Sequence, residues 1–201
     1  MKVQAAAPRR RYRMTARAEA AAATGERILD AATEVFWQGL TPDISLDEVA
    51  RRAGVSVQTV IRRFGGKDGL MAAAADREVD RIRRQRNAPD PGDVAGAVKV
   101  LVDHYEETGD RVLRMLAEEQ RLPWLAPLVE RGRELHRDWC EHMFGFALDG
   151  LAGVQRRRRL AQLIAVGDVY TWKLLRRDSG LSRKQTELAL TELLNAILER
   201  D

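Results

Sequence analysis

Residues 45–70 read SLDEVARRAGVSVQTVIRRFGGKDGL, two short helical segments on either side of Gly54. Ser45 can cap the first helix, and Glu48, three residues on, can bond back to the Ser45 amide, which together would make a capping box. Gly54 supplies a tight turn, and the second helix, from about 56 to 64, stops at two further glycines. Small or apolar side chains stand where two short helices must pack closely: Val49, Ala50, Ala53, Val55 and Val60. This spacing is typical of a helix-turn-helix.

Helical periodicity continues on both sides of this stretch. Apolar residues recur at helical spacing from about 24 to 38, and Gly39 is placed to end that helix. Further helices are predicted at about 67–86, 93–107, 110–121, 126–148, 155–177 and 182–200, and Ser182 with Gln185 forms a second capping box at the start of the last one. No run alternates with period two, so we expect an all-α chain of about nine helices and no sheet.

Charge is divided unevenly along the chain. Residues 1–86 carry 17 Lys and Arg against 11 Asp and Glu, whereas residues 87–201 carry 17 against 19. A basic N-terminal part beside a slightly acidic remainder suggests that nucleic acid is bound at one end. Residues 1–22, with six basic residues and no apolar periodicity, are interpreted as a flexible basic arm, which either contacts DNA phosphates or is only solvated.

The cysteine count and the hydropathy pattern indicate the cellular compartment in which the protein is found. Cys140 is the only cysteine, so no intramolecular disulfide and no cysteine-based zinc site are expected. No stretch approaches the length of a membrane span or a signal-peptide core. We therefore expect a cytoplasmic bacterial protein that does not contact a membrane.

The stretch from Gly54 to Leu70 resembles the TetR family of transcriptional regulators. The family pattern around its second short helix, approximately G-V-S-x-x-T-x-Y-x-x-F-x-x-K-x-x-L, is matched in register by Gly54, Val55, Ser56, Thr59, Phe64, Lys67 and Leu70. Ile61 departs from it, because the family usually has a tyrosine there whose hydroxyl can reach a phosphate. The resemblance implies a helix-turn-helix DNA-binding domain at 23–70 and a helical effector-binding and dimerisation domain at 71–201, with a connecting helix at 67–86.

The second short helix of this motif has a polar and basic surface that suits the major groove. We assign base-edge contacts to Val57, Gln58 and Arg62, since glutamine can pair with adenine, arginine with guanine, and valine can touch a thymine methyl. Phosphate contacts are assigned to Thr59, Arg63 and Lys67, the last beside the free amides of a helix N-terminus. The remaining predicted DNA-binding residues are Ser45 and Ser56.

The C-terminal part is expected to bind a second copy of the chain and a small molecule. In the TetR family the last two helices usually form a four-helix dimer interface, and here they carry more apolar residues than one amphipathic face needs. A homodimer places two recognition helices about one DNA turn apart, so that a palindromic operator is read. Large or soft side chains that can line a pocket for a hydrophobic or aromatic effector are Tyr105, Met115, Trp124, Trp139, Met143, Phe144, Tyr170 and Trp172, although such residues are also typical of plain core.

The sequence gives little support to an enzymatic function. His104, His136 and His142 do not have metal-site spacing, and neither of the last two is expected on the helix face of Cys140. We therefore predict no catalytic residue, no metal and no cofactor. The hypothesis is a ligand-released regulator, with repression as the family expectation; the alternatives are a DNA-binding regulator without a ligand and, less favoured, a helical enzyme acting on an anionic substrate.

Overall fold

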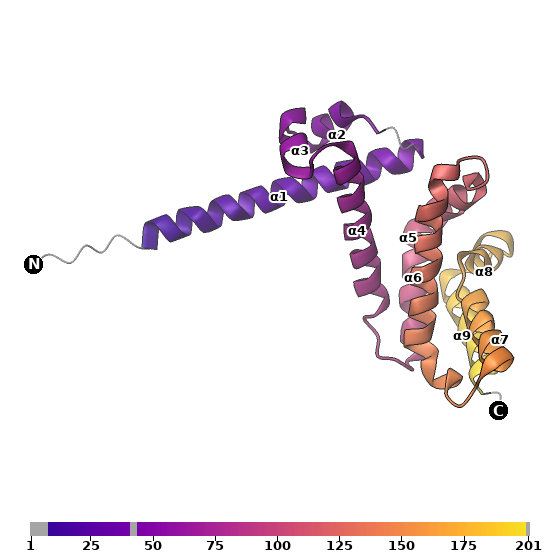
Figure 1. Cartoon of the computed structure of the whole chain (residues 1–201). Coiled ribbons are helices and arrows are strands. Elements are labelled where there is room, and N and C mark those ends of the chain that lie inside the picture. Colours follow the sequence, from indigo (N-terminus) through magenta and orange to yellow (C-terminus); the bar gives the residue numbers. More distant parts are fainter. Residues whose placement is uncertain (1–7, 41–43, 200–201) are drawn as a thin grey trace, which may run out of the picture. The chain divides into compact units, whose positions relative to one another are not determined.

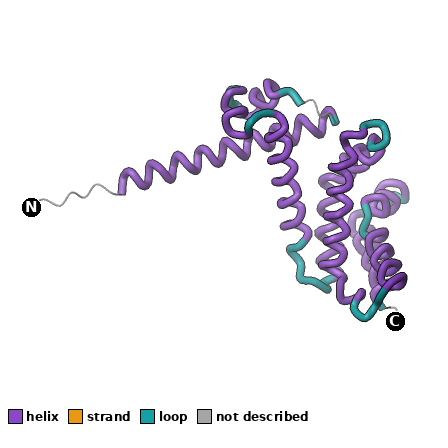
Figure 2. Tube along the Cα trace, viewed as in Figure 1, coloured by secondary structure: helices purple, strands orange, loops and turns teal. Residues whose placement is uncertain are grey.

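The computed structural model describes residues 8–40 and 44–199, with the side chains described from residue 18 onward. Helices and loops make up all of these residues, and no strand is found among them (Figure 2). The all-α prediction is confirmed. The chain divides into two compact units, residues 1–78 and 79–201.

The first unit is built on α1 (Pro8–Gly39), α2 (Leu46–Ala53), α3 (Val57–Phe64) and the beginning of α4 (Lys67–Arg86). Figure 1 shows α2 and α3 beside the C-terminal part of α1. The apolar faces of these helices meet in one core that includes Ile28, Ala32, Val49, Ala53, Val60 and Leu70. The helical spacing seen in the sequence therefore becomes a buried seam.

Helix α1 begins much earlier than the sequence pattern predicts. The structure places residues from Pro8 onward in α1, so the interpretation of 1–22 as a flexible arm is wrong over 8–22, and residues 1–7 of that arm lie outside the described residues. Alanine and arginine are among the strongest helix formers, and the segment from Arg9 to Ala23 is made largely of them. Residues 18–23 are exposed, so this part of the helix has no apolar periodicity that could have revealed it.

The second unit contains α5 (Val94–Glu118), α6 (Ala126–Phe144), α7 (Gly153–Val166), α8 (Val169–Lys173) and α9 (Arg183–Leu198). Three short turns connect them: η1 (Pro123–Leu125), η2 (Gly145–Leu148) and the π-helical η3 (Leu174–Asp178). Helix α5 packs against α6, α8 and α9, and α7 packs against α6 and α9. Their shared core includes Leu101, Tyr105, Trp139, Phe144, Leu163, Trp172, Leu190 and Leu194.

The predicted break between helices at 93–107 and 110–121 is wrong, because α5 runs without interruption through Thr108 and Gly109. The Thr108 hydroxyl donates to the carbonyl of His104, one turn back, at 2.8 Å. Gly109 is kept small by its neighbour: a Cβ atom there would lie 2.6 Å from a ring carbon of the buried Trp172. This glycine permits close helix packing and does not end a helix.

The predicted helix at 155–177 is also wrong, since α7 ends at Val166 and α8 begins at Val169. The Tyr105 hydroxyl donates to the carbonyl of Gly167 at 3.0 Å, and the Asp168 carboxylate accepts the Tyr170 amide at 2.9 Å. Both interactions stabilise the interruption with groups that periodicity cannot reveal. Similarly, the segment predicted as 126–148 leaves α-helical geometry after Phe144.

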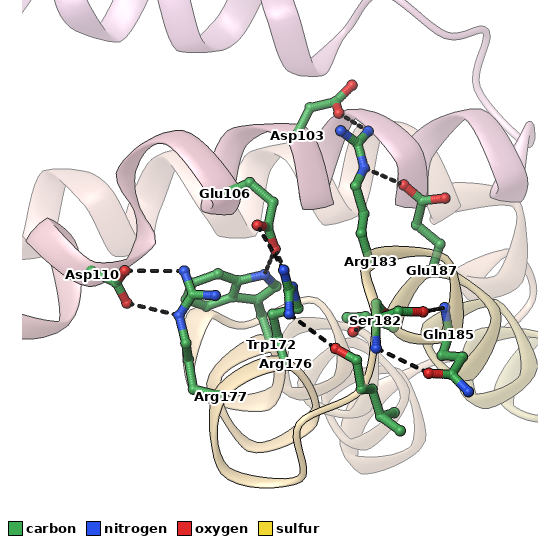
Figure 3. Close-up of polar contacts among 12 residues, drawn as sticks. Asp103, Glu106, Asp110, Trp172, Arg176, Arg177, Ser182, Arg183, Gln185 and Glu187 are labelled. Atoms are coloured by element: carbon green, nitrogen blue, oxygen red, sulfur yellow. Dashed lines mark hydrogen bonds and ion pairs between the residues drawn. The ribbon is translucent and has the colours of Figure 1, made fainter.

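Polar contacts join α5 to the C-terminal helices (Figure 3). Glu106 accepts from the indole of Trp172 at 3.3 Å and from Arg176 at 2.8 Å, and Asp110 pairs with Arg177 at 3.0 Å. The predicted capping box at the start of α9 is confirmed. The Gln185 backbone amide donates to the Ser182 hydroxyl, and the Ser182 backbone amide donates to the Gln185 side chain. The Glu106 and Asp110 contacts hold α8 and η3 against α5.

Candidate nucleic-acid interface

The turn between α2 and α3 depends on Gly54. Its backbone is left-handed, with φ of 67°, a conformation in which a side chain would be strained. Val49, Ala50 and Ala53 of α2 are buried, as is Val60 of α3, so small side chains let the two helices approach closely. The helix-turn-helix inferred from the sequence is therefore present as a packed element.

Both ends of α3 are closed by local hydrogen bonds. The Ser56 hydroxyl accepts the Thr59 amide at 3.3 Å and lies 3.0 Å from the Thr59 hydroxyl, and Gly65 ends the helix in a left-handed conformation. Thr59 is predicted to contact phosphate, and Ser56 is predicted as a DNA-binding residue. In this structure their hydroxyls cap α3, and an exposed Ser56 side chain at a helix start remains compatible with an anion nearby.

The outward face of α3 presents Gln58 and Arg62, four residues apart and both exposed. Val60, on the opposite side, is fully buried. Val57 is half-buried and packs partly against the core of the unit, and Ile61, which departs from the family pattern, is 40% exposed. Of the three predicted base-contacting residues, Gln58 and Arg62 thus share one solvent-exposed surface, and Val57 lies at its margin.

The side chain of Arg63 lies against α1, unlike that of Arg62. A Cβ atom on the buried Gly25 of α1 would come within 2.3 Å of a terminal guanidinium nitrogen of Arg63, so this side chain lies over the α1 backbone. Its guanidinium carbon is also 5.9 Å from the centre of the Phe64 ring. Arg63 therefore joins α3 to α1, and Gly25 is the residue that makes room for it. Sequence reasoning missed Gly25, whose signal was a lone glycine inside a helix.

Glu48 holds the arginines of α2. Its carboxylate lies 2.6 Å from both Arg51 and Arg52, and the hydrogen bonds from these two residues lower the pKa of Glu48 to about 2. Ser45 accepts the Glu48 amide at 3.3 Å, but the Glu48 side chain turns to the arginines instead of to the Ser45 amide. The predicted capping box is therefore only half formed. Lys67, the last of the predicted phosphate contacts, is the half-buried first residue of α4.

The predicted effector-binding residues fall into two groups. Most of them are buried in the core of the second unit: Tyr105, Met115, Trp139, Met143, Phe144 and Trp172. Trp124 is half-buried, and Tyr170 is 52% exposed on α8. Sequence reasoning missed the buried Arg86, which lies among the first group and gave no signal, since it ends a helix rich in arginine.

Cys140 and His136 are closer than the sequence analysis expects. They are four residues apart on α6, which places them on one helix face, and Cys140 Sγ lies 3.9 Å from His136 Nε2. Burial raises the pKa of Cys140 to about 12, and burial together with the Arg86 charge lowers that of His136 to about 4. Such a pair has neither a thiolate nor an imidazolium near neutral pH. Among the described residues no group of three or more His, Cys, Asp or Glu side chains is placed to hold a metal ion, and no helix there is long and apolar enough to cross a membrane.

These features define a helix-turn-helix protein with a capped, outward-facing recognition helix and a separate helical unit. Residues 28–74 match the family described as bacterial regulatory proteins, tetR family, a stretch that contains α2, α3 and the surrounding core. This stretch therefore belongs to the TetR family of helix-turn-helix regulators, which confirms the resemblance found in the sequence.

Relatives in sequence match a short stretch of the chain. The chain is 47% identical over 56 residues to TtgW of Pseudomonas putida, an uncharacterized HTH-type transcriptional regulator, covering 27% of this chain and 42% of TtgW. It is 46% identical over 56 residues to the HTH-type transcriptional regulator SrpR of Pseudomonas putida, covering 27% of this chain and 26% of SrpR. The matched region thus spans less than half the length of these curated relatives.

Solved structures extend the similarity to most of the chain at the level of the fold. A transcriptional regulator from Rhodococcus sp. Rha1 covers 87% of this chain and 96% of its own, with a TM-score of 0.59 and 23% identity. A TetR-family regulator from Rhodococcus sp. covers 88% of this chain and 99% of its own, with a TM-score of 0.60 and 16% identity. The helical C-terminal unit therefore has the fold found in these two solved structures.

Proposed function

We propose that this chain is a ligand-responsive transcriptional regulator, a repressor, that binds palindromic operator DNA as a homodimer and is released by a small hydrophobic or aromatic effector. The observation that carries the proposal is the outward face of α3. Gln58 and Arg62 are exposed on one side of a capped helix whose other side is buried, and among the described residues neither side chain forms an ion pair or a side-chain hydrogen bond. Glutamine and arginine are the side chains that pair bidentately with adenine and guanine.

The DNA experiment is a mobility shift with the DNA upstream of this protein's own gene, across a salt series, for the wild type, Gln58→Ala and Arg62→Ala. Loss of one bidentate base contact costs about 1–3 kcal/mol, which is about 5- to 150-fold in affinity, and relaxes the preference for one base. The effect should double in free energy if two copies bind one palindrome. Affinity for unrelated DNA should change much less.

Arg51→Ala is the matched control. Arg51 is an exposed arginine of the same motif, but Glu48 already holds its guanidinium at two hydrogen bonds. Its removal should change neither specificity nor the salt slope by the amount that Arg62→Ala does. Equal, weak binding of every variant to any DNA would contradict the proposal and leave only a basic helical protein.

Dimerisation is supported by apolar side chains on the surface of α9. Leu188 is 59% and Leu193 44% exposed, whereas Leu190 and Leu194 of the same helix are buried within the chain. The exposed leucines are the apolar surface that a second copy would cover. Light scattering should report a dimer for the wild type and a monomer for the double variant Leu188→Glu with Leu193→Glu; a variant that stays dimeric would show that another surface is used.

Release by an effector requires that the second unit influences the first. Within the part of the chain that the structure describes, α4 is the helix that runs from the first unit into the second. It starts at Lys67, directly after the α3 turn, and ends at Arg86 among the aromatic residues of the second unit. We therefore propose α4 as the coupling element, with the effector stabilising a conformation of lower operator affinity. A thermal-shift screen separates this from a regulator without a small-molecule ligand, for which no compound should both stabilise the protein and weaken operator binding.

A further inference from the structure

Arg86 is a buried cation in the second unit. Only 4% of its surface is exposed, and no carboxylate within the described residues forms an ion pair with it. One terminal nitrogen lies 3.2 Å from His136 Nδ1, while Nε has no hydrogen-bond partner. An unpaired charge of this kind is expensive to keep away from water, so its surroundings require an explanation.

The neighbours of Arg86 are aromatic rings and neutral histidines. Its guanidinium carbon is 5.3 Å from the centre of the Tyr105 ring and 5.2 Å from that of Trp139, which are cation–π distances. His136 is held neutral, since its Nε2 lies 3.1 Å from the Ile164 carbonyl, to which it donates, and its Nδ1 is left to accept from Arg86. The cluster therefore carries a single positive charge inside apolar walls.

A second unpaired polar atom belongs to the same surroundings. His104 is 5% exposed and its Nδ1 has no partner, although its ring is 5.4 Å from that of Tyr105. Asp168 is near enough for its charge to raise the pKa of Tyr105 and Cys140, but its carboxylate accepts the Tyr170 amide as the cap of α8. Among the described residues, no acceptor is therefore placed at the Nε atom of the guanidinium.

We propose that Arg86 is the anchor for the acidic group of a small organic acid whose apolar, aromatic body lies against Tyr105 and Trp139. The inference rests on the proposed function, because it names the chemical class of the effector. A carboxylate accepts two parallel hydrogen bonds along the Nε edge of a guanidinium, and it supplies the negative charge that the cluster lacks. Because Arg86 is almost fully buried, the acid enters only when neighbouring side chains move, so association is slower than diffusion.

The test is calorimetric titration of the full-length protein, without DNA, with two matched pairs of probes: benzoate against benzamide and 2-naphthoate against 2-naphthamide. Each amide keeps the ring and removes the charge. The acids should bind at least about tenfold more tightly than their amides, as expected for a charge-assisted pair. Equal affinity of acid and amide, or no binding of either acid at millimolar concentration, would overturn the proposal.

Two variants locate the binding. Arg86→Met keeps an unbranched apolar stem and should lower 2-naphthoate affinity at least about tenfold while leaving 2-naphthamide unchanged. Arg177→Met is the control, since Arg177 also stacks on a tryptophan, at 4.5 Å from Trp172, but already pairs with Asp110. Undiminished 2-naphthoate binding by Arg86→Met would overturn the proposal, and if that variant does not fold, the acid and amide comparison on the wild type still decides.

Failure of the acid-binding inference can be distinguished from failure of the proposed function. Operator binding is measured by mobility shift without any probe, so a protein that binds its operator but prefers no acid keeps the regulator and loses this inference. A protein that prefers acids but binds no specific DNA loses the regulator and keeps the anion site.

Discussion

Lowering the pH from 7.5 to 5.5 should destabilise this protein through two buried histidines. Burial, followed by the charge of Arg86, lowers the pKa of His104 to about 2 and that of His136 to about 4, from an ordinary value of 6.5. The unfolded chain therefore binds more protons than the folded one below pH 6.5. Stability that is present above that pH is lost as the pH falls toward the folded-state values.

The size of the effect follows from the two pKa values of each histidine. Between pH 7.5 and 5.5 each neutral histidine gives up about 1.3 kcal/mol of unfolding free energy, and the two together about 2.6 kcal/mol. Carboxyl groups contribute little in this window, because an unfolded Glu or Asp is already ionised at pH 5.5. A loss of this size is a large part of the roughly 5–15 kcal/mol that stabilises a typical domain.

The assay is urea unfolding followed by circular dichroism at pH 7.5, 6.5 and 5.5, for the wild type and for His104→Gln, His136→Gln and His142→Gln. The readout is the change in unfolding free energy with pH and not its absolute value, so a variant that is somewhat less stable remains informative. Each buried variant should lose about half of the pH dependence. His142→Gln is the control, because His142 is exposed on α6, and this variant should keep the pH dependence of the wild type.

Full retention of the wild-type pH dependence by His136→Gln would refute this reasoning. It would mean that His136 is protonated in the folded protein or exposed to water near neutral pH, and the arrangement of one cation among neutral rings would no longer hold. The inference drawn for Arg86 would then lose its electrostatic basis, although its geometry would stand.

Three further predictions concern stability. Gly109→Ala should lower the unfolding free energy by about 1–2 kcal/mol in thermal or urea unfolding, because the clash with Trp172 outweighs the better helix propensity of alanine. Gly132→Ala should raise the unfolding free energy by about 0.5–1 kcal/mol, because Gly132 has open space around it on α6. Arg86→Met should leave the melting temperature unchanged or raise it, since no buried carboxylate is left unpaired; a loss of about 3 kcal/mol would instead identify a hidden structural partner. Ser182→Ala should cost about 1 kcal/mol in urea unfolding by removing the cap of α9, and no loss would mean that the capping box does not stabilise the folded chain.

The fold of the first unit could be predicted because its signals are local. Gly54 and the small residues around it report a turn and a close helix contact within a few positions of one another, and the structure confirms both. The failures in the second unit have a different origin. Position 109 holds a glycine because the ring of Trp172, 63 positions away, leaves no room for a side chain, and this glycine therefore does not mark a helix end. The break at Gly167 depends on the hydroxyl of Tyr105. Neither cause lies within reach of a local pattern.

The candidate site shows the same division. Exposure of Gln58 and Arg62 follows from helical spacing once Val60 is placed inward, so the exposure of these two side chains could be predicted from the sequence. The position of Arg63 over Gly25 was not, because it depends on how α3 lies against a helix nearly forty residues earlier. Arg86 was missed for a related reason: an arginine at the end of a basic helix is typical of a solvated surface, and only tertiary packing buries it.

A basic composition also overstates the charge available to DNA. In the first unit, Arg51 and Arg52 are held by Glu48, and Arg77 lies 2.8 Å from Asp30 and 3.1 Å from Glu26. Counterion release counts only the cations that neutralise phosphate, and arginines already paired with carboxylates add little to it. The salt slope of operator binding should therefore be smaller than the number of Lys and Arg in residues 1–86 suggests.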